Sequence, residues 1–358
     1  WEAAQQIAAA RDLTRAVAAV APRSCSARYL VARGTTAPSF ESPLVSVETV
    51  PMPAGMLPFL WQSGASARPL DGEFVHSLTP LAPLRSRDED DGSQTSVAVP
   101  HSIAWEAPAL MGSGQARLYR SFVRRAVKYA DVLVTTTHAT ARALQEQYGS
   151  ALPVQVMPLA PPAEFLPGPD AAERRTALGL PPHYAVTTAA PGEHGRLDWI
   201  LDSLRADASL PPVVIIEGLD PRAPKTENGK TDPPPVVPDE LRDRAFAVQP
   251  RDLSDVGAIL AGAGLLLQPQ AYTGAGYTLL GALGAALPVL HSGHPATDEI
   301  VFDAGCVAET KEAFASEFSR LTHDHSDRKT LALLARDRSR SFSWAGTAWQ
   351  LWETHANL

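Results

Sequence analysis

The stretch QAYTGAGYTLLGALGAALPVL, residues 270–290, decides the fold of this chain. Together with the apolar run over 264–269, it is typical of a strand, a small-residue turn, a helix from Tyr277 and a second strand. Gly274 and Gly276 permit positive φ and close approach of a ligand to the backbone. The helix N-terminus adds free N–H groups and a partial positive charge, so a diphosphate fits there. A turn that binds nothing has the same pattern, so the stretch alone leaves both interpretations open.

The same alternation of short apolar runs and longer amphipathic segments continues on both sides of this stretch. In the first half it predicts strands at 27–33, 44–50, 73–77, 97–101, 131–136 and 153–159, and helices at 2–20, 115–129 and 138–148. In the second half it predicts strands at 184–189, 212–218, 244–249, 264–269, 287–292 and 305–309, and helices near 196–206, 253–262, 275–286, 311–321 and 325–340. This is the pattern of an α/β protein with parallel sheets and crossover helices.

A proline-rich segment, PLAPPAEFLPGPD at 158–170, separates the two halves. Its prolines stiffen the chain and disfavour helix and sheet, so we place a domain junction there. We expect a first domain over 1–160, a second over 161–340, and a closing helix over 341–358 that packs back toward the first domain. Because the chain opens inside a helical pattern, we expect a preceding strand of the first domain before Trp1.

The composition limits the classes of partner. The 358 residues carry a net charge of -8, which argues against nucleic acid as a general partner because phosphate binding needs a basic surface. Two cysteines, Cys25 and Cys306, are too few for a disulfide framework and are interpreted as small buried side chains. We find neither a membrane-spanning apolar run nor a signal peptide pattern, so we expect a cytoplasmic protein.

Three polar segments have simple interpretations. The acidic run SRDEDDGSQT at 86–95 and the proline-rich run over 221–240 are expected to be exposed loops. In THDHSD, His323 and His325 lie close together, but further ligands at a zinc-site spacing are missing. This segment is interpreted as a surface turn, and we expect neither a metal nor another cofactor.

Five further segments follow one another along the chain in an order that can be compared with known families. They are VAVPHSIAWEAP (97–108), RSFVRRAVKYADVLVTTTHATARAL (120–144), AERRTALGLPPHYAVTTA (172–189), DEIVFDAG (298–305) and FSWAGTAWQLWE (342–353). With residues 270–290 they resemble the retaining glycosyltransferases of family 4, over nearly the whole chain from about residue 73. The resemblance implies the GT-B fold, with two facing Rossmann-like domains, parallel sheets and an interdomain cleft. The first domain would face the acceptor, and the second would bind a nucleotide-sugar donor.

The resemblance also implies roles for individual residues. His101 matches a histidine near the donor sugar, although a strand-end histidine satisfied by backbone has the same sequence signature. Gly274 and Gly276, followed by Tyr277, match the phosphate-facing turn. Glu299 matches a glutamate just past the Pro-Val-Leu strand, where it either orients the cleft or caps the following helix.

The chain also departs from the family pattern. Thr273 and Gly281 stand where the family has two glutamates that contact the sugar and the ribose. His194 and Gly195 stand where the family has an Arg-Lys pair for the diphosphate, and Arg196 follows immediately. Thr273 can still make one hydrogen bond, and Arg196 is the candidate cation for the leaving phosphates.

Two functions from different classes follow. The first is a divergent, retaining, hexosyltransferase-like enzyme that moves a sugar from a nucleotide-diphosphate donor onto a glycan, lipid or small-molecule acceptor. The second is a catalytically silent protein that binds a glycan or partners an active glycosyltransferase. The helix carrying Arg117, Arg120, Arg124, Arg125 and Lys128 either contacts an anionic lipid surface at the inner face of a membrane or is a solvated face.

Overall fold

The computed structural model describes residues 2–64, 74–86, 92–111, 114–217 and 237–358. It divides into two compact units. Unit 1 comprises Trp1–Gln5 and Pro161–Ser341, and unit 2 comprises Gln6–Ala160 and Phe342–Leu358. Loops were predicted at 86–95 and 221–240. Residues 87–91 of the first and 221–236 of the second lie outside the described residues.

Unit 1 is built on a six-stranded parallel sheet with the order β12-β11-β10-β7-β8-β9. Its strands are β7 (Ala185–Thr187), β8 (Val213–Ile216), β9 (Ala245–Val248), β10 (Leu266–Gln268), β11 (Val289–His291) and β12 (Gly305–Val307). Numbered along the unit, this is the 3-2-1-4-5-6 order of the Rossmann fold. Each strand falls inside a predicted segment and is shorter than it, so the predicted parallel sheet is confirmed for this half.

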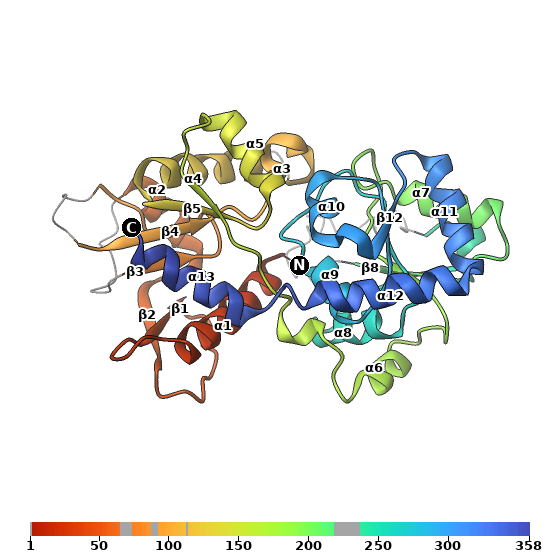
Figure 1. Ribbon diagram of the computed structural model, residues 1–358, viewed down its shortest axis with the longest axis horizontal. Coiled ribbons are helices and arrows are strands. Elements are labelled where there is room, and N and C mark those ends of the chain that lie inside the picture. The colour runs from red at the N-terminus through yellow and green to blue at the C-terminus, as the bar shows by residue number, and fades with distance from the viewer. Residues whose placement is uncertain (1, 65–73, 87–91, 112–113, 218–236) are drawn as a thin grey trace, which may run out of the picture. The chain divides into compact units, whose positions relative to one another are not determined.

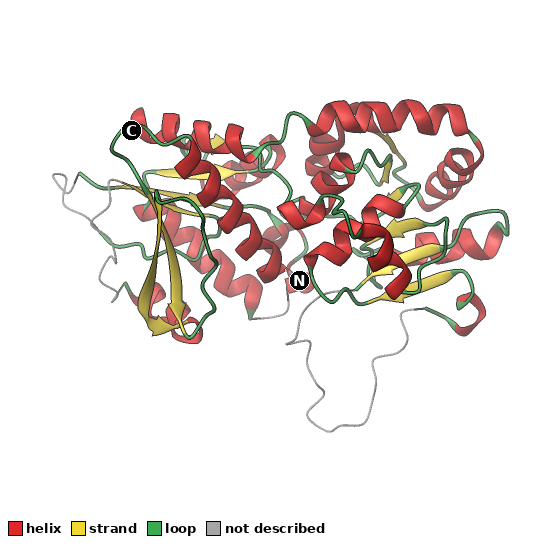
Figure 2. Cartoon of the chain, turned by 90° about the horizontal axis from the view of Figure 1, so that it is seen from below, coloured by secondary structure: helices red, strands yellow, loops and turns green. Residues whose placement is uncertain are grey.

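Helices cover both faces of this sheet (Figure 2). They are α6 (Ala171–Ala177), α7 (Leu197–Ala206), α8 (Leu253–Gly262), α9 (Tyr277–Gly284), α10 (Pro295–Val301), α11 (Lys311–His323) and α12 (His325–Ser339), with 3-10 turns η3 (Ala163–Phe165), η4 (Asp239–Leu241) and η5 (Phe302–Ala304). On one face, α7 and α11 bury leucines and phenylalanines against Ile215, Leu267 and Leu290. The alternate residues Val214 and Leu266 are also fully buried, as expected for a sheet covered on both sides.

Side-chain caps explain why several helices of unit 1 begin where they do. Asp252, Thr310 and Asp324 precede α8, α11 and α12, and each accepts a hydrogen bond from the backbone N–H three residues ahead. Such caps satisfy N–H groups that the first turn of a helix leaves free, and each stabilises its helix by about 1 kcal/mol. The helix starts therefore follow from local sequence.

Unit 2 contains two parallel sheets, β1-β2 and β3-β4-β5-β6. Its strands are β1 (Ala27–Arg33), β2 (Val45–Pro53), β3 (Phe74–Ser77), β4 (Gln94–Ala98), β5 (Val132–Thr135) and β6 (Val154–Val156). Its helices are α1 (Glu2–Ala19, in this unit from Gln6), α2 (Leu57–Ser63), α3 (Ile103–Glu106), α4 (Gln115–Tyr129), α5 (His138–Tyr148) and α13 (Trp344–Ala356), with 3-10 turns η1 (Ala54–Met56) and η2 (Pro108–Met111).

In this half, one predicted strand has other bounds and a short helix was not predicted. The strand expected at 97–101 is β4, which begins at Gln94 inside the predicted acidic loop and ends at Ala98. Thr95, Ser96, Val97 and Ala98 are all buried, so the strand starts before the apolar residues that predicted it. Helix α2 was not predicted, because its seven residues are too short to show a helical period.

The C-terminal helix α13 belongs to unit 2 and lies beside α1 (Figure 1). Leu351 of α13 packs with Ala98, Val134 and Met157 of the sheet region. The Trp352 indole donates a hydrogen bond to the Val17 carbonyl, with an N–O distance of 3.2 Å. Helix α13 thus completes the core of a unit from which it is far removed in sequence.

Candidate functional site

The carboxyl edge of the unit 1 sheet brings two loops together. The loop after β7 and the loop after β10 leave neighbouring strands where the strand order reverses. The Ala271 N–H donates to the His194 carbonyl at 2.9 Å, which ties the two loops directly. In Rossmann-type sheets, ligands bind at the carboxyl ends of the strands at such a switch point.

Arg196 lies between these loops. It is the N-cap of α7 and has a left-handed backbone, with φ 53° and ψ 30°. Its guanidinium carbon lies 4.6 Å from the centre of the Trp199 ring, and its Nη1 is 3.4 Å from the Pro269 carbonyl oxygen. A guanidinium has five N–H donors, so these contacts leave donors for an anion.

Gly195 allows the loop before α7 to close tightly. A Cβ at this position would lie 2.1 Å from the Ala190 carbonyl oxygen, so a side chain cannot be accommodated without moving the backbone. The loop is held by hydrogen bonds from Arg196 N–H to Gly192 and from Leu197 N–H to Ala190. A cationic side chain at position 195 would therefore clash with this backbone.

In the turn after β10, there is free space beside Gly274, whereas Gly276 packs against a side chain of α10. A Cβ on Gly274 would have no atom within 4 Å, whereas a Cβ on Gly276 would lie 2.7 Å from Ile300 Cδ1. Gly276 has φ +81° and is the N-cap of α9, with no side chain to occupy the helix N-terminus. The Tyr277 ring is only 1% exposed and belongs to the core. Its expected contribution to donor binding is thereby reduced to its backbone N–H.

Thr273 is engaged inside the protein. It is buried, its hydroxyl is 3.1 Å from His294 Nδ1, and it also hydrogen-bonds to the Thr297 hydroxyl. Both partners belong to the start of α10. The hydrogen bond that we expected Thr273 to offer a sugar is thus made to α10, because the turn packs directly on that helix.

Gly281 fills a position where a larger side chain does not fit. A Cβ there would lie 3.0 Å from Leu260 Cδ1 and 3.1 Å from Phe165 Cβ. Phe165 is fully buried, and η3 packs on both α8 and α9. The space in which the family pattern places a ribose-contacting glutamate is therefore part of the core.

Glu299 lies within α10, near its C-terminal end, and is half-buried. The N-cap of this helix is His294, whose ring accepts a hydrogen bond from the Ala296 N–H. The capping role considered for Glu299 is therefore wrong. Its backbone carbonyl accepts a hydrogen bond from Arg338 at 2.7 Å, which attaches α10 to α12.

His101 lies in unit 2, beyond the end of β4. It is buried, and its ring stacks on Tyr119 with centroids 4.9 Å apart. The Tyr119 hydroxyl donates to the His101 carbonyl. Strand β4 ends earlier than predicted, so the segment that carries His101 follows the strand and leads into α3.

The sequence analysis missed a row of polar residues at the carboxyl ends of β10 and β11. Gln268 and His291 are the last residues of these strands and pair directly in the ladder. Gln270 follows two residues later, and its Nε2 donates to the Thr188 hydroxyl at 3.1 Å. The available signal was a polar residue at the end of each apolar run, in LLLQPQ and VLHS.

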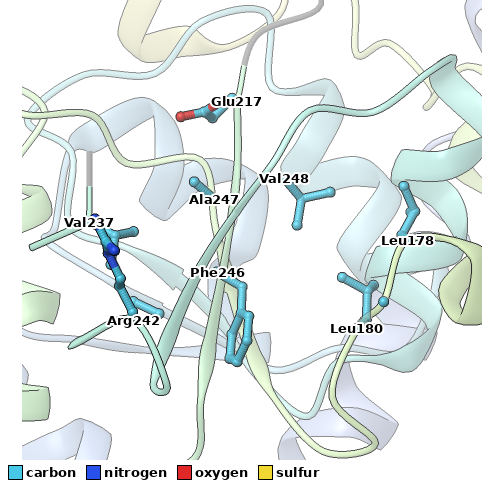
Figure 3. A pocket seen from close by; sticks show the side chains of 10 residues that line it. Leu178, Leu180, Glu217, Val237, Arg242, Phe246, Ala247 and Val248 are labelled. Atoms are coloured by element: carbon cyan, nitrogen blue, oxygen red, sulfur yellow. The ribbon is translucent and has the colours of Figure 1, made fainter. Parts of the chain in front are cut away.

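Other candidate features lie elsewhere. A hollow of about 410 Å³ runs along the edge strand β9, where Leu178, Leu180 and Val248 gather at one end and Arg242 at the other (Figure 3). Glu217 and Val237, which also line it, flank residues that the structure does not describe, so we do not assign it to the site. Within the described ranges, three or more His, Cys, Asp or Glu side chains nowhere form a group that could hold a metal ion.

The basic helix α4 presents a mixed surface. Arg117, Arg124 and Lys128 are exposed, whereas the Arg125 guanidinium donates to the Leu84 carbonyl at 2.6 Å. The exposed Phe59 lies on α2, which contacts α4. A helix long and apolar enough to cross a membrane is not found in the part of the chain that the structure describes.

Comparison with known proteins is informative at the level of structure alone. Neither a protein-family model nor a curated protein sequence matches the chain. Sucrose-phosphate synthase from Thermosynechococcus elongatus is similar with a TM-score of 0.70 and 17% identity, over 97% of this chain and 92% of that one. HepE of Anabaena, solved in complex with UDP and glucose, has a TM-score of 0.63 and 16% identity, over 88% of this chain and 86% of that one.

A third solved structure is similar to this chain over nearly its whole length. WaaG, a glycosyltransferase involved in lipopolysaccharide biosynthesis, has a TM-score of 0.63 and 18% identity, over 95% of this chain and 94% of that one. At these identities the similarity concerns the fold. The chain therefore has the α/β fold of the GT-B glycosyltransferases, with parallel sheets in a Rossmann-like arrangement.

Proposed function

We propose that this chain is a divergent glycosyltransferase that binds a nucleotide-diphosphate sugar at the carboxyl edge of the unit 1 sheet. One observation carries the proposal. The Arg196 guanidinium lies against the loop after β10, at the switch point of a Rossmann-type sheet. The proposed reaction transfers the sugar with retention to a glycan, lipid or small-molecule acceptor.

The electrostatics of this edge suit a diphosphate. The N-terminus of α9 carries a partial positive charge, and Gly274 leaves the turn open for close approach of an anion. Arg196 supplies a full positive charge, and a charge-assisted hydrogen bond contributes about 1.5–3 kcal/mol. The proposal requires neither a metal nor another cofactor, because these groups balance the leaving phosphates.

Thermal unfolding in the presence of UDP, GDP and ADP tests donor binding. UDP comes first because HepE, which has the same fold, was solved with UDP. A nucleotide at 100 times its dissociation constant adds about 2.7 kcal/mol, a shift of several degrees. A shift with one base identifies the donor class. The absence of a shift with all three, and with their sugar conjugates, would refute the proposal.

A catalytically silent protein is the second candidate, either a glycan-binding protein or a partner subunit of an active glycosyltransferase. The observations that favour it are the internal bonds of Thr273 and the closed packing around Gly281. Release of free nucleotide from UDP-glucose, measured with and without small acceptors, separates the candidates. Donor binding without any turnover across an acceptor panel would support the silent protein.

The acceptor-side proposal concerns α4. The exposed cations Arg117, Arg124 and Lys128 of α4, together with the exposed Phe59 on the contacting helix α2, suit an anionic membrane surface at the inner face of a cytoplasmic membrane. Co-sedimentation with vesicles of phosphatidylglycerol and phosphatidylcholine tests this contact. Binding that disappears in a variant with all three cations changed to Gln supports contact of α4 with an anionic membrane surface. Equal binding by that variant would indicate that the helix face is merely solvated.

A further inference from the structure

Gln270 is tied into the switch point on two sides. Its side-chain Nε2 donates to the Thr188 hydroxyl, in the loop after β7, at 3.1 Å. Its backbone carbonyl accepts a hydrogen bond from the Ser292 hydroxyl, just after β11, at 2.7 Å. Gln270 thus connects the ends of three neighbouring strands.

The Oε1 atom of the Gln270 amide has no hydrogen-bond partner among the described residues, although the residue is only 2% exposed. Because Nε2 is engaged by Thr188, the atom left without a partner is the acceptor Oε1. A buried amide atom without a hydrogen bond destabilises a protein, and most native proteins contain few of them. Retention of Gln270 at this position therefore calls for a reason beyond packing.

Two further side chains at the same edge each have a buried polar atom without a hydrogen-bond partner among the described residues. Gln268 Oε1 and His291 Nε2 are buried and have no hydrogen-bond partner within the described part of the chain. They are direct neighbours in the β10–β11 ladder but are not bonded to each other. His291 Nδ1 accepts from the Gly293 N–H, so Nε2 carries the proton of the neutral ring. Burial lowers the pKa of His291 to about 4, which keeps the ring neutral at pH 7.

The edge therefore combines two uncharged acceptors and one uncharged donor beneath the turn that precedes α9. These groups cannot replace the charge of two glutamates, but they can recognise hydroxyl and N–H groups. Their position matters because a site that hydrogen-bonds a ligand's polar groups rejects ligands that lack them. The neutral residues thus supply a kind of recognition that Thr273 and Gly281 do not.

We propose that Gln270 determines donor specificity by accepting a hydrogen bond from an uncharged O–H or N–H group in the nucleoside or sugar part of the donor. Thr188 orients the Gln270 amide, and Gln268 and His291 add two further polar groups at the same edge of the sheet. This inference rests on the proposed function, since it assigns part of the same donor site. The phosphates are left to Arg196 and the turn at Gly274.

Calorimetric titration of wild-type protein and a Gln270→Leu variant with UDP-glucose, UDP and inorganic diphosphate tests the proposal. We expect Gln270→Leu to weaken binding of UDP-glucose by about 10-fold and to leave binding of diphosphate within twofold of wild type. If the O–H or N–H group that bonds to Gln270 belongs to the nucleoside, the variant's affinity for UDP should fall by the same factor as its affinity for UDP-glucose. If that group belongs to the sugar, the affinity for UDP should not change.

Two threonines provide a matched pair of variants. Thr188→Val removes the bond that orients Gln270 and should weaken UDP-glucose binding in the same direction, by a smaller factor. Thr187→Val is the control, because the Thr187 hydroxyl donates to the Leu267 carbonyl and accepts from the Ala189 N–H but does not touch Gln270. This control should lose stability and keep its affinity.

Two results would overturn the inference, and they differ. If wild-type protein binds nucleotide and Gln270→Leu binds UDP-glucose equally well, Gln270 serves packing or an internal water only, and the proposed function survives. If wild-type protein binds none of these probes, and none of GDP, ADP and their sugar conjugates, the proposed function fails and this assignment fails with it.

Discussion

At the N-cap of α7, Arg196 adopts a left-handed backbone that glycine adopts more readily than any other residue. For a residue with a Cβ, this conformation costs about 1–2 kcal/mol. Residues in such backbone regions persist where the surrounding structure holds them, and they are enriched at active sites and ligand-binding segments. The conformation places the guanidinium on Trp199 and beside Pro269, at the diphosphate site that we propose.

Because Arg196 has a strained backbone, replacing it with glycine should change nucleotide affinity without much change in stability. In an Arg196→Gly variant, relief of backbone strain offsets the lost contact with Trp199, so the free energy of unfolding should stay within about 1 kcal/mol of wild type. Nucleotide-diphosphate binding should weaken by about 10- to 100-fold, because one charge-assisted hydrogen bond is lost. Urea unfolding and calorimetry measure the two quantities. Unchanged affinity would exclude Arg196 from the site.

Thr273 illustrates the opposite case, a candidate site residue with a structural role. Thr273→Val keeps the side-chain shape but removes the bonds to His294 and Thr297, leaving the buried Thr297 hydroxyl without this partner. We expect a loss of about 1–3 kcal/mol, or roughly 2–12 °C in Tm for a unit of this size. Thr278→Val, in the first turn of α9, is the control. Equal Tm values for the two variants would disprove the link to α10.

At the level of elements, α9 is shaped by its glycines. Gly281 faces Leu260 of α8 and Phe165 of η3, and Gly284 faces Leu166, so the helix approaches its neighbours more closely than larger residues would allow. Close approach brings the turn at Gly276 against Ile300 of α10. The geometry of the candidate phosphate turn therefore depends on packing on the far side of α9.

This packing predicts that the family's glutamate cannot be restored. Gly281→Glu would place an unpaired carboxylate against Phe165 and Leu260, and we expect destabilisation by at least about 3 kcal/mol. Nucleotide affinity should not improve. Gly55→Glu is a suitable control, since a Cβ at Gly55 meets no atom within 4 Å. A stable Gly281→Glu protein with tighter UDP binding would show that the space near Phe165 opens.

At the scale of the whole molecule, a chain of hydrogen bonds joins the C-terminal helix to the sheet of unit 2. His355 Nδ1 donates to Gln94 Oε1, so His355 Nε2 accepts from the Ser96 hydroxyl, and Ser96 accepts from His76 Nδ1. Each of these contacts is 2.8 Å long. The pattern requires a neutral His355, because protonation of Nε2 removes its acceptor.

This network predicts a pH-dependent stability of unit 2. Burial and the neighbouring His355 lower the pKa of His76 to about 3, and burial lowers the pKa of His355 to about 4. In the unfolded chain both titrate near 6.5, so below that pH the unfolded state binds more protons than the folded state. The free energy of unfolding is therefore highest above pH 6.5 and falls toward pH 4. The slope is at most about 1.4 kcal/mol per pH unit for each histidine.

A His355→Phe variant tests this prediction. It preserves the stacking on Phe74 and removes one titrating group, so stability should fall at pH 7.5 but decline less steeply between pH 6.5 and 4.5. Guanidinium unfolding across this range measures the slope. His183→Gln, at an exposed position, is the control and should keep the wild-type slope. A His355→Phe slope equal to wild type would contradict the assignment.

The sequence by itself determined most of the longer elements and the turn at the centre of the candidate site. The helices predicted at 115–129, 138–148 and 253–262 form with these bounds, because periodicity and capping depend on residues within a few positions of each other. The tertiary structure alone decided which side chains serve the candidate site. Thr273 bonds to Thr297, Phe165 closes the space at Gly281, and Gln270 reaches Thr188, and each of these pairs joins segments far apart in sequence. Such contacts arise only when strands and helices pack, so they leave no signal in local sequence.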